Sequence, residues 1–155
     1  SIEDLVIRAS GEMGPVFLDG MGDGIWIEED QLGLEPSVLR HLSFNILQSS
    51  GIRISKTEYI SCPGCGRTLF NLQKITQKIK AETSHLNGLK IGIMGCIVNG
   101  PGEMADADYG YVGAGPGKVS LYKGREMVKQ GLPEEDAVQE LIELIKSDGK
   151  WQDIK

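Results

Sequence analysis

Three cysteines are the residues of this sequence best suited to chemistry, and they fall in two motifs. Cys62 and Cys65 form a Cys-x-x-Cys pair around Pro63-Gly64, and Cys96 opens a glycine-rich segment that runs to Glu103. A Cys-x-x-Cys turn can direct two thiolates to one metal centre, or it can form a redox dithiol. Because three cysteines cannot all pair in disulfides, their number favours metal or redox chemistry.

Glycines surround both motifs. Gly64 and Gly66 lie in the first motif, and Gly95 and Gly100 lie on either side of the second. Glycine lets the backbone fold closely around an inorganic centre and direct its N–H groups at sulfur. A thioredoxin-like pair would leave Cys96 without a role. Three thiolates from two glycine-rich loops therefore indicate an iron-sulfur cluster or zinc.

Three thiolates leave a fourth ligand to be found, and the candidates are His85, Glu103 and a non-protein ligand. A carboxylate is unusual for structural zinc, which is bound by Cys and His. As a hard and exchangeable ligand, Glu103 would leave one metal open to a substrate oxygen, which favours catalysis. The alternative is a zinc-stabilised interaction module without catalysis, with the ligands Cys62, Cys65, Cys96 and His85.

The composition excludes several classes of protein. The chain has 155 residues, of which 40% are hydrophobic and 25% charged, as in globular proteins and unlike collagen or disordered chains. Its longest apolar stretch, Ile91–Val98, is too short to cross a bilayer, so we expect no membrane partner. The net charge of -6 argues against nucleic acid as a partner. No secretion signal opens the sequence, so we expect a reducing compartment that keeps the cysteines free.

The first 52 residues are predicted to be the tail of a preceding domain. Val16–Leu18 and Ile25–Ile27 resemble two short strands separated by a Gly-Asp turn, and a helix is expected from Pro36 to Gly51. A strand-loop-strand-helix segment of this size cannot enclose a core of its own. We therefore expect residues 1–52 to be the C-terminal remnant of another domain.

Residues 53–155 are predicted to form one compact α+β unit that holds all three cysteines. The expected fold is a small mixed or antiparallel sheet flanked by helices. Residue patterns predict strands at 53–60, 89–94, 109–112, 119–122 and 126–129, and helices at 69–81 and after Pro133. The last helix is expected to turn five residues inward: Ala137, Val138, Leu141, Ile142 and Ile145. The first two strands lead into the two cysteine motifs, so the sheet is expected to position them.

The two cysteine segments resemble a known family. Lys56–Phe70 and Met94–Glu103 resemble the C-terminal domain of the 4-hydroxy-3-methylbut-2-enyl diphosphate synthase family, reductive enzymes of the non-mevalonate isoprenoid pathway. Met104–Gly113 resembles the longer form found in plants, chlamydiae and some other bacteria. The resemblance covers about residues 53–150, and residues 16–50 resemble the barrel-derived stretch that precedes this domain.

This resemblance implies a cofactor and a set of site residues. Cys62, Cys65 and Cys96 would be the thiolate ligands of a 4Fe-4S cluster. Glu103 would be the carboxylate on its fourth iron. Asn99 would lie beside bound substrate, where its amide could hydrogen-bond an alkoxide or diphosphate oxygen.

The resemblance also implies a reaction, its partners and a location. The family converts 2-C-methyl-D-erythritol 2,4-cyclodiphosphate to 4-hydroxy-3-methylbut-2-enyl diphosphate, opening the ring and losing water with two electrons from ferredoxin or flavodoxin. Residues 1–52 would be the end of a barrel-like domain, and residues 53–155 the iron-sulfur cluster domain. Because the rest of the barrel supplies most of the basic residues that hold the diphosphate, we expect the isolated chain to be inactive. The expected location is the bacterial cytoplasm, or the plastid stroma for a plant-type source.

Overall fold

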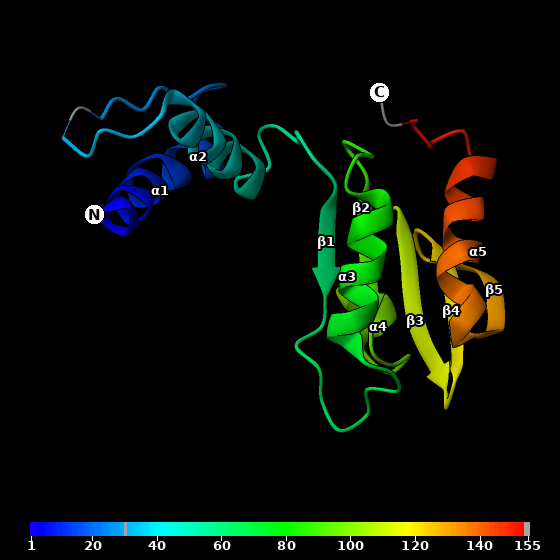
Figure 1. The fold of residues 1–155 in the computed structure, drawn as a ribbon. Coiled ribbons are helices and arrows are strands. Elements are labelled where there is room, and N and C mark those ends of the chain that lie inside the picture. Colours follow the sequence, from blue (N-terminus) through cyan, green and yellow to red (C-terminus); the bar gives the residue numbers. More distant parts are fainter. Residues whose placement is uncertain (30, 154–155) are drawn as a thin grey trace. The chain divides into compact units, whose positions relative to one another are not determined.

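The chain forms two compact units, residues Ser1–Ser55 and Lys56–Lys155. A computed structural model describes residues 1–29 and 31–153 (Figure 1). Each unit is built around apolar clusters of its own, and each is described by itself below. None of the described helices combines the length and the apolar character needed to cross a bilayer.

The first unit begins with a helix where the sequence pattern predicted a strand. Helix α1 (Ile2–Leu18) contains the whole of Val16–Leu18, so the strand predicted there is wrong. The side chain of Ser1 caps the helix by accepting a hydrogen bond from the Asp4 backbone. Residues repeating every fourth position face the core of the unit, and Val16–Leu18 continues that helical period. The residues of this repeat are Leu5, Ala9, Met13 and Phe17.

The second strand predicted in this unit, Ile25–Ile27, is also absent. The segment carries no β-bridge, although Ile25 and Ile27 pack on the apolar cluster of the unit while Trp26 is 84% exposed. A strand needs a hydrogen-bonded neighbour, and no described residue pairs with this segment. Helix α2 (Pro36–Ser49) confirms the predicted helix. The unit is thus a helix-loop-helix arrangement and not the predicted strand-loop-strand-helix.

The second unit is a five-stranded mixed sheet in the order β1-β2-β3-β4-β5, which confirms the predicted α+β class. The first three strands run parallel to one another, and the last three form an antiparallel meander. The strands are β1 (Glu58–Ser61), β2 (Lys90–Met94), β3 (Tyr109–Gly115), β4 (Lys118–Lys123) and β5 (Glu126–Pro133). Gly124, at a φ of 56°, makes the expected turn between the last two strands.

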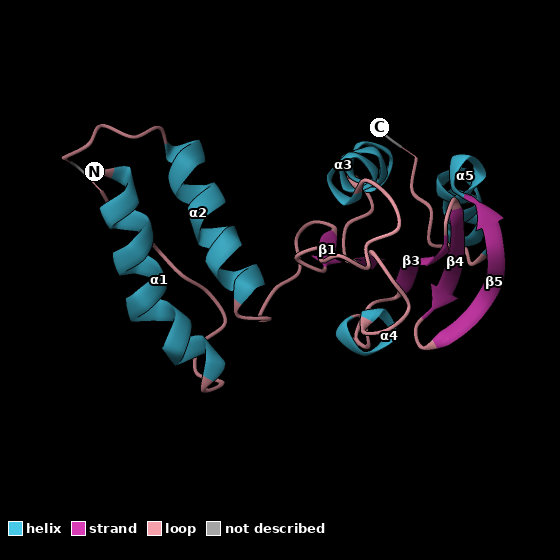
Figure 2. Cartoon of the chain, turned by 90° about the horizontal axis from the view of Figure 1, so that it is seen from below, coloured by secondary structure: helices cyan, strands magenta, loops and turns pink. Residues whose placement is uncertain are grey.

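Helices cover both faces of this sheet. Helices α3 (Leu72–Thr83) and α5 (Glu134–Ser147) lie on one face, and the single-turn helix α4 (Gly100–Glu103) lies on the other (Figure 2). Each of the five residues predicted to face inward from the last helix is buried. The other face is covered by a smaller cluster that includes Met94 and Met104. The turn of helix α4 was expected to be loop, and Pro101 in its first turn favours the helix.

The parallel pairing of β1 with β2 brings the two cysteine motifs to one edge of the sheet. Ser61 is in register with Ile93, and each strand runs toward the same edge. Cys62 directly follows β1, and Cys96 follows β2 after a single glycine. Residues separated by more than thirty positions therefore become neighbours.

Two glycines let the segments at this edge pack closely. A Cβ added to Gly113 of β3 would lie 2.4 Å from the carbonyl oxygen of Gly95. A Cβ added to Gly95 would lie 2.8 Å from the side chain of Thr68, in the loop after Cys65. The Gly95 carbonyl also accepts a hydrogen bond of 3.1 Å from the Leu69 backbone N–H. The end of β2 is thus held between β3 and the Cys-x-x-Cys loop.

This packing predicts that Gly113→Ala destabilises the second unit by about 1–3 kcal/mol, because the new methyl group would push against backbone. Gly115→Ala, in the same strand, is the control, since nothing lies within 4 Å of a Cβ added there. Urea unfolding followed by Trp151 fluorescence, in a Trp26→Phe background, measures both variants. Equal midpoints for the two variants would contradict the close approach of β3 to Gly95.

Candidate metal centre

The residues singled out by the sequence line one small cavity at the edge where β1 and β2 end. The cavity has a volume of about 100 Å³. Cys62, Cys65, Cys96, Asn99 and Glu103 all line it. The remaining lining residues come from the same loops and strand ends, and they are Pro63, Gly64, Arg67, Met94 and Gly100. The structure therefore brings together the three cysteines, Asn99 and Glu103, but not His85, the other candidate ligand.

Cys62 is the thiol of the cavity that packs against an apolar cluster. It is half-buried and lies against the apolar cluster that contains Met94 and Met104. Its Sγ accepts a hydrogen bond of 3.3 Å from the Gly95 backbone N–H. A backbone N–H aimed at sulfur stabilises negative charge there, as a thiolate ligand requires.

Cys65 is the exposed thiol of the cavity. Its loop is closed by two hydrogen bonds with Thr68: the Cys65 N–H donates to the Thr68 Oγ1 over 3.0 Å, and the Thr68 N–H donates to the Cys65 carbonyl over 3.0 Å. A hydrogen bond from the Arg67 backbone lowers the pKa of the Cys65 thiol, and the Arg67 side chain adds to this effect, whereas partial burial opposes it. The site thus favours a thiolate at this position.

The second motif contributes a thiol, an amide and a carboxylate. Cys96 is half-buried, and Asn99 and Glu103 are exposed. The Glu103 N–H donates to the Asn99 carbonyl over 3.0 Å, so the two residues are one helical turn apart in helix α4. The Asn99 side chain makes no capping hydrogen bond to the helix. Its amide is available to a bound molecule.

The candidate ligand side chains line one cavity but do not converge on a single position in it. The three cysteines are free thiols, and among the described residues no three His, Cys, Asp or Glu side chains converge closely enough to hold one ion. The donor set itself, three soft sulfur ligands and one exchangeable carboxylate, suits iron-sulfur ligation better than structural zinc. The backbone N–H that donates to the Cys62 sulfur and the lowered pKa of the exposed Cys65 thiol are consistent with thiolate ligands of such a cluster.

His85 lies away from this cavity. It precedes β2, whereas Cys96 follows that strand, so the two residues belong to opposite edges of the sheet. A five-residue strand spans roughly 16 Å. The His85 ring packs edge-on against Trp151 with ring centroids 5.0 Å apart, and its buried Nε2 has no hydrogen-bond partner among the described residues. The zinc ligand set that included His85 is therefore wrong.

Thr68 is the residue of this site that sequence reasoning missed. Its hydroxyl accepts the Cys65 N–H, and its side chain contacts the place where a Cβ of Gly95 would be. The available signal was a hydroxyl residue three positions after the second cysteine, a spacing typical of a side chain that closes a turn. Arg67, which the sequence pattern did not single out, also lines the cavity.

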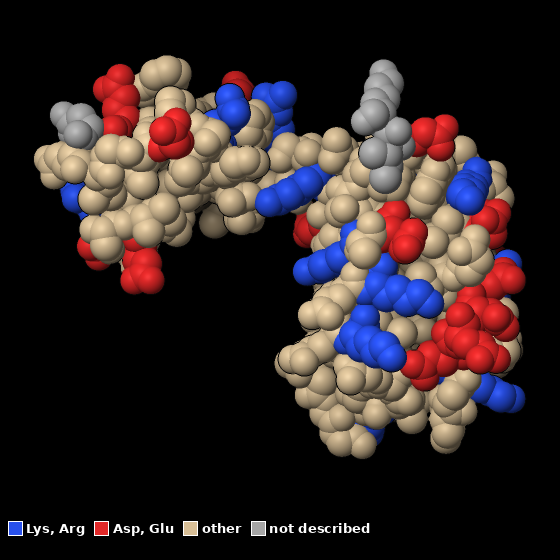
Figure 3. Space-filling view, in the orientation of Figure 1, with Lys and Arg blue, Asp and Glu red and all other residues tan. Residues whose placement is uncertain are grey.

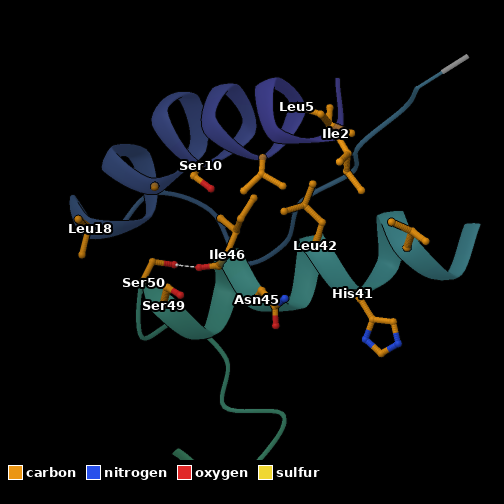
Figure 4. Close-up of a pocket in the computed structure, with 13 residues that line it drawn as sticks. Ile2, Leu5, Ser10, Leu18, His41, Leu42, Asn45, Ile46, Ser49 and Ser50 are labelled. Atoms are coloured by element: carbon orange, nitrogen blue, oxygen red, sulfur yellow. Dashed lines mark hydrogen bonds between the residues drawn. The ribbon is translucent and has the colours of Figure 1, made fainter. Parts of the chain in front are cut away.

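A larger hollow lies in the first unit, between α1 and α2, and has a volume of about 550 Å³. Most of its lining side chains are apolar, and the Ser50 hydroxyl donates to the Ile46 carbonyl within its wall (Figure 4). Of the described residues that line it, His41 is the one titratable side chain. The hollow therefore presents a mainly apolar surface with a single titratable group among its described lining residues.

Comparison with known proteins places these features in a family context. The GcpE protein C-terminal domain family matches residues 58–147. Three relatives carry the name 4-hydroxy-3-methylbut-2-en-1-yl diphosphate synthase (flavodoxin). The one from Porphyromonas gingivalis is 61% identical over 98% of this chain, and the one from Bacteroides fragilis is 61% identical over 97%. The protein of that name from Chlorobaculum tepidum is 58% identical over 96%. The chain spans 26%, 24% and 20% of the length of these relatives, respectively.

The environment of the thiols predicts their order of reactivity in the reduced, metal-free chain. Iodoacetamide will alkylate Cys65 several-fold faster than Cys62 or Cys96 near neutral pH, because Cys65 is exposed and its lowered pKa increases the thiolate fraction. Its rate will also rise at a lower pH than that of an unperturbed cysteine. Peptide mass spectrometry after short pulses measures the three rates. Equal rates in the folded chain, as expected in urea, would contradict this description of the loop.

Proposed function

The chain belongs to the GcpE protein C-terminal domain family, and from this membership we propose that it is the iron-sulfur part of a 4-hydroxy-3-methylbut-2-enyl diphosphate synthase. The observation that carries the proposal is the cavity lined by all three cysteines together with Asn99 and Glu103. The reaction proposed for the complete enzyme converts 2-C-methyl-D-erythritol 2,4-cyclodiphosphate to 4-hydroxy-3-methylbut-2-enyl diphosphate. It consumes two electrons, opens the ring and releases water.

Cys62, Cys65 and Cys96 would hold a 4Fe-4S cluster, with Glu103 on its fourth iron. When bound, such a cluster supplies single electrons and a Lewis-acidic iron. Backbone groups of the chain favour negatively charged sulfur at two of these cysteines. The Gly95 N–H donates to the Cys62 sulfur, and the Arg67 backbone favours the thiolate of Cys65.

Asn99 and Glu103 would act on the substrate side of the cavity. Helix α4 fixes them one turn apart on the same wall, and both are exposed to an entering molecule. The Asn99 amide can donate to an alkoxide or diphosphate oxygen, which orients the carbon skeleton. The Glu103 carboxylate is an exchangeable anionic ligand, so it can give way to a substrate oxygen.

The remainder of the substrate site would come from a barrel-like domain. In this proposal residues 1–52 belong to the end of that domain and residues 53–155 form the cluster domain. The segment Ile25–Ile27 supports this assignment because it is apolar, alternates between packed and exposed side chains and has no strand neighbour among the described residues, as expected of a strand whose partners lie elsewhere. The isolated chain is accordingly expected to be inactive.

The proposed donor and location follow from the same relatives. Ferredoxin or flavodoxin would supply the electrons, and the names of the bacterial relatives specify flavodoxin. Because these relatives are bacterial, the proposed location is the bacterial cytoplasm, whose reducing conditions would keep thiols free for metal ligation.

The proposed role of Asn99 is tested in a chimera in which this chain replaces the matching segment of the Porphyromonas gingivalis relative. We expect Asn99→Ala to lower kcat/KM for the cyclic diphosphate about 100-fold, because one positioned donor is lost in the transition state. Asn87→Ala is the control, since Asn87 is an exposed amide in the turn before β2, at the opposite edge of the sheet. Phosphorus NMR measures ring opening. Equal loss in both variants, or none in Asn99→Ala, would contradict the role.

A further inference from the structure

The part of the sequence around the cysteine motifs differs in charge from the rest of the chain. The whole chain has 16 basic and 22 acidic residues. Residues 59–102, which include both motifs except Glu103, have five basic residues and a single acidic residue, Glu82. An acidic protein therefore contains a mainly basic stretch of sequence around its two cysteine motifs.

Two of these cations, Lys74 and Lys78, are exposed on one helix and are here named the α3 basic face. Arg67 follows the exposed thiol Cys65 by two positions and lines the cavity. Lys74 and Lys78 lie one turn apart on α3, which begins at the cysteine edge of the sheet. Among the described residues neither lysine has an ion-pair partner. Basic side chains gather over α3, whereas acidic side chains gather over α5 (Figure 3).

The α3 basic face and the proposed substrate side lie on different faces of the sheet. Helix α3 packs on the face that carries the main apolar cluster, and helix α4, with Asn99 and Glu103, packs on the other (Figure 2). The Cys65 loop leads toward α3, and the Cys96 loop leads into α4. A macromolecule could thus approach Cys65 from the α3 side without displacing a substrate beside Asn99.

We propose that the α3 basic face is the docking surface for an acidic flavodoxin that delivers electrons at the Cys65 side of the cavity. This inference rests on the proposed function, and it adds the place of entry and the charge of the partner. Each reduced donor gives one electron and is oxidised, so two encounters supply the two electrons of one turnover.

Charge complementarity is the argument for an acidic partner. A chain with a net charge of -6 repels an anionic protein over most of its surface. The α3 basic face therefore selects the orientation in which the donor reaches the metal centre. The names of the relatives specify a flavodoxin, which is a protein rather than a small reductant and so must dock on the surface of the chain.

The first test measures binding of oxidised flavodoxin to the 155-residue chain by titration calorimetry at low and moderate salt. The variant Lys74→Glu with Lys78→Glu is expected to raise Kd at least tenfold and to abolish its salt dependence. The matched control is Arg125→Glu with Lys150→Glu, which changes the charge equally. Both control residues are exposed and lie near the edge opposite the cysteines, where the Tyr109 hydroxyl donates to Asp148. Equal weakening in both double variants would overturn the proposal.

The second test measures turnover in the same chimera with two reductants. With reduced flavodoxin, the Lys74→Glu, Lys78→Glu variant is expected to raise the KM for flavodoxin about tenfold. With dithionite and methyl viologen, its kcat and its KM for the cyclic diphosphate are expected to match the wild type. A raised KM for the cyclic diphosphate would assign the lysines to substrate binding and overturn the docking proposal.

Failure of the two proposals can be told apart. If the wild-type chimera does not reduce the cyclic diphosphate with dithionite, the proposed function fails, whereas flavodoxin binding to the chain still reports on docking. If dithionite supports turnover but charge reversal leaves the KM for flavodoxin unchanged, the function stands and the docking surface is wrong.

Discussion

The parallel pairing of β1 with β2 is the constraint on which the site depends. It places the end of each strand at the same edge of the sheet, so that Cys62 and Cys96 become neighbours despite their distance in sequence. The glycines at this edge then determine how closely the segments approach. Gly113 accommodates the carbonyl of Gly95, and Gly95 accommodates Thr68. A side chain at Gly95 would push the Thr68 loop away from the end of β2, and one at Gly113 would push β3 away from Gly95.

Local sequence patterns predicted most of the second unit because its helices and turns are determined by residues close together in the sequence. The inward stripe of α5 and the turn at Gly124 depend on helical period and on one backbone conformation, both of which are visible in sequence. The first unit was predicted less well. Val16–Leu18 has β-forming residues but continues the helical repeat of α1, and Ile25–Ile27 lacks the hydrogen-bonded neighbour that a strand requires.

The candidate site was predicted through its cysteines and not through its supporting groups. Sequence spacing identified the three thiols, Asn99 and Glu103, which line one cavity. It left His85 as a possible ligand because the residue type alone was considered, although a strand at 89–94 separates His85 from Cys96. Thr68 was missed because its role depends on contact with Gly95, a residue from a different loop.

The central claim is that the three thiols hold a 4Fe-4S cluster, and iron, sulfide and zinc analysis after anaerobic reconstitution tests it most directly. The account predicts about four irons and four sulfides per chain, with visible absorption that is lost in Cys96→Ser and retained in His85→Ala. His85→Ala is the matched control because His85 lies at the opposite edge of the sheet. One zinc per chain without iron or sulfide would contradict the account.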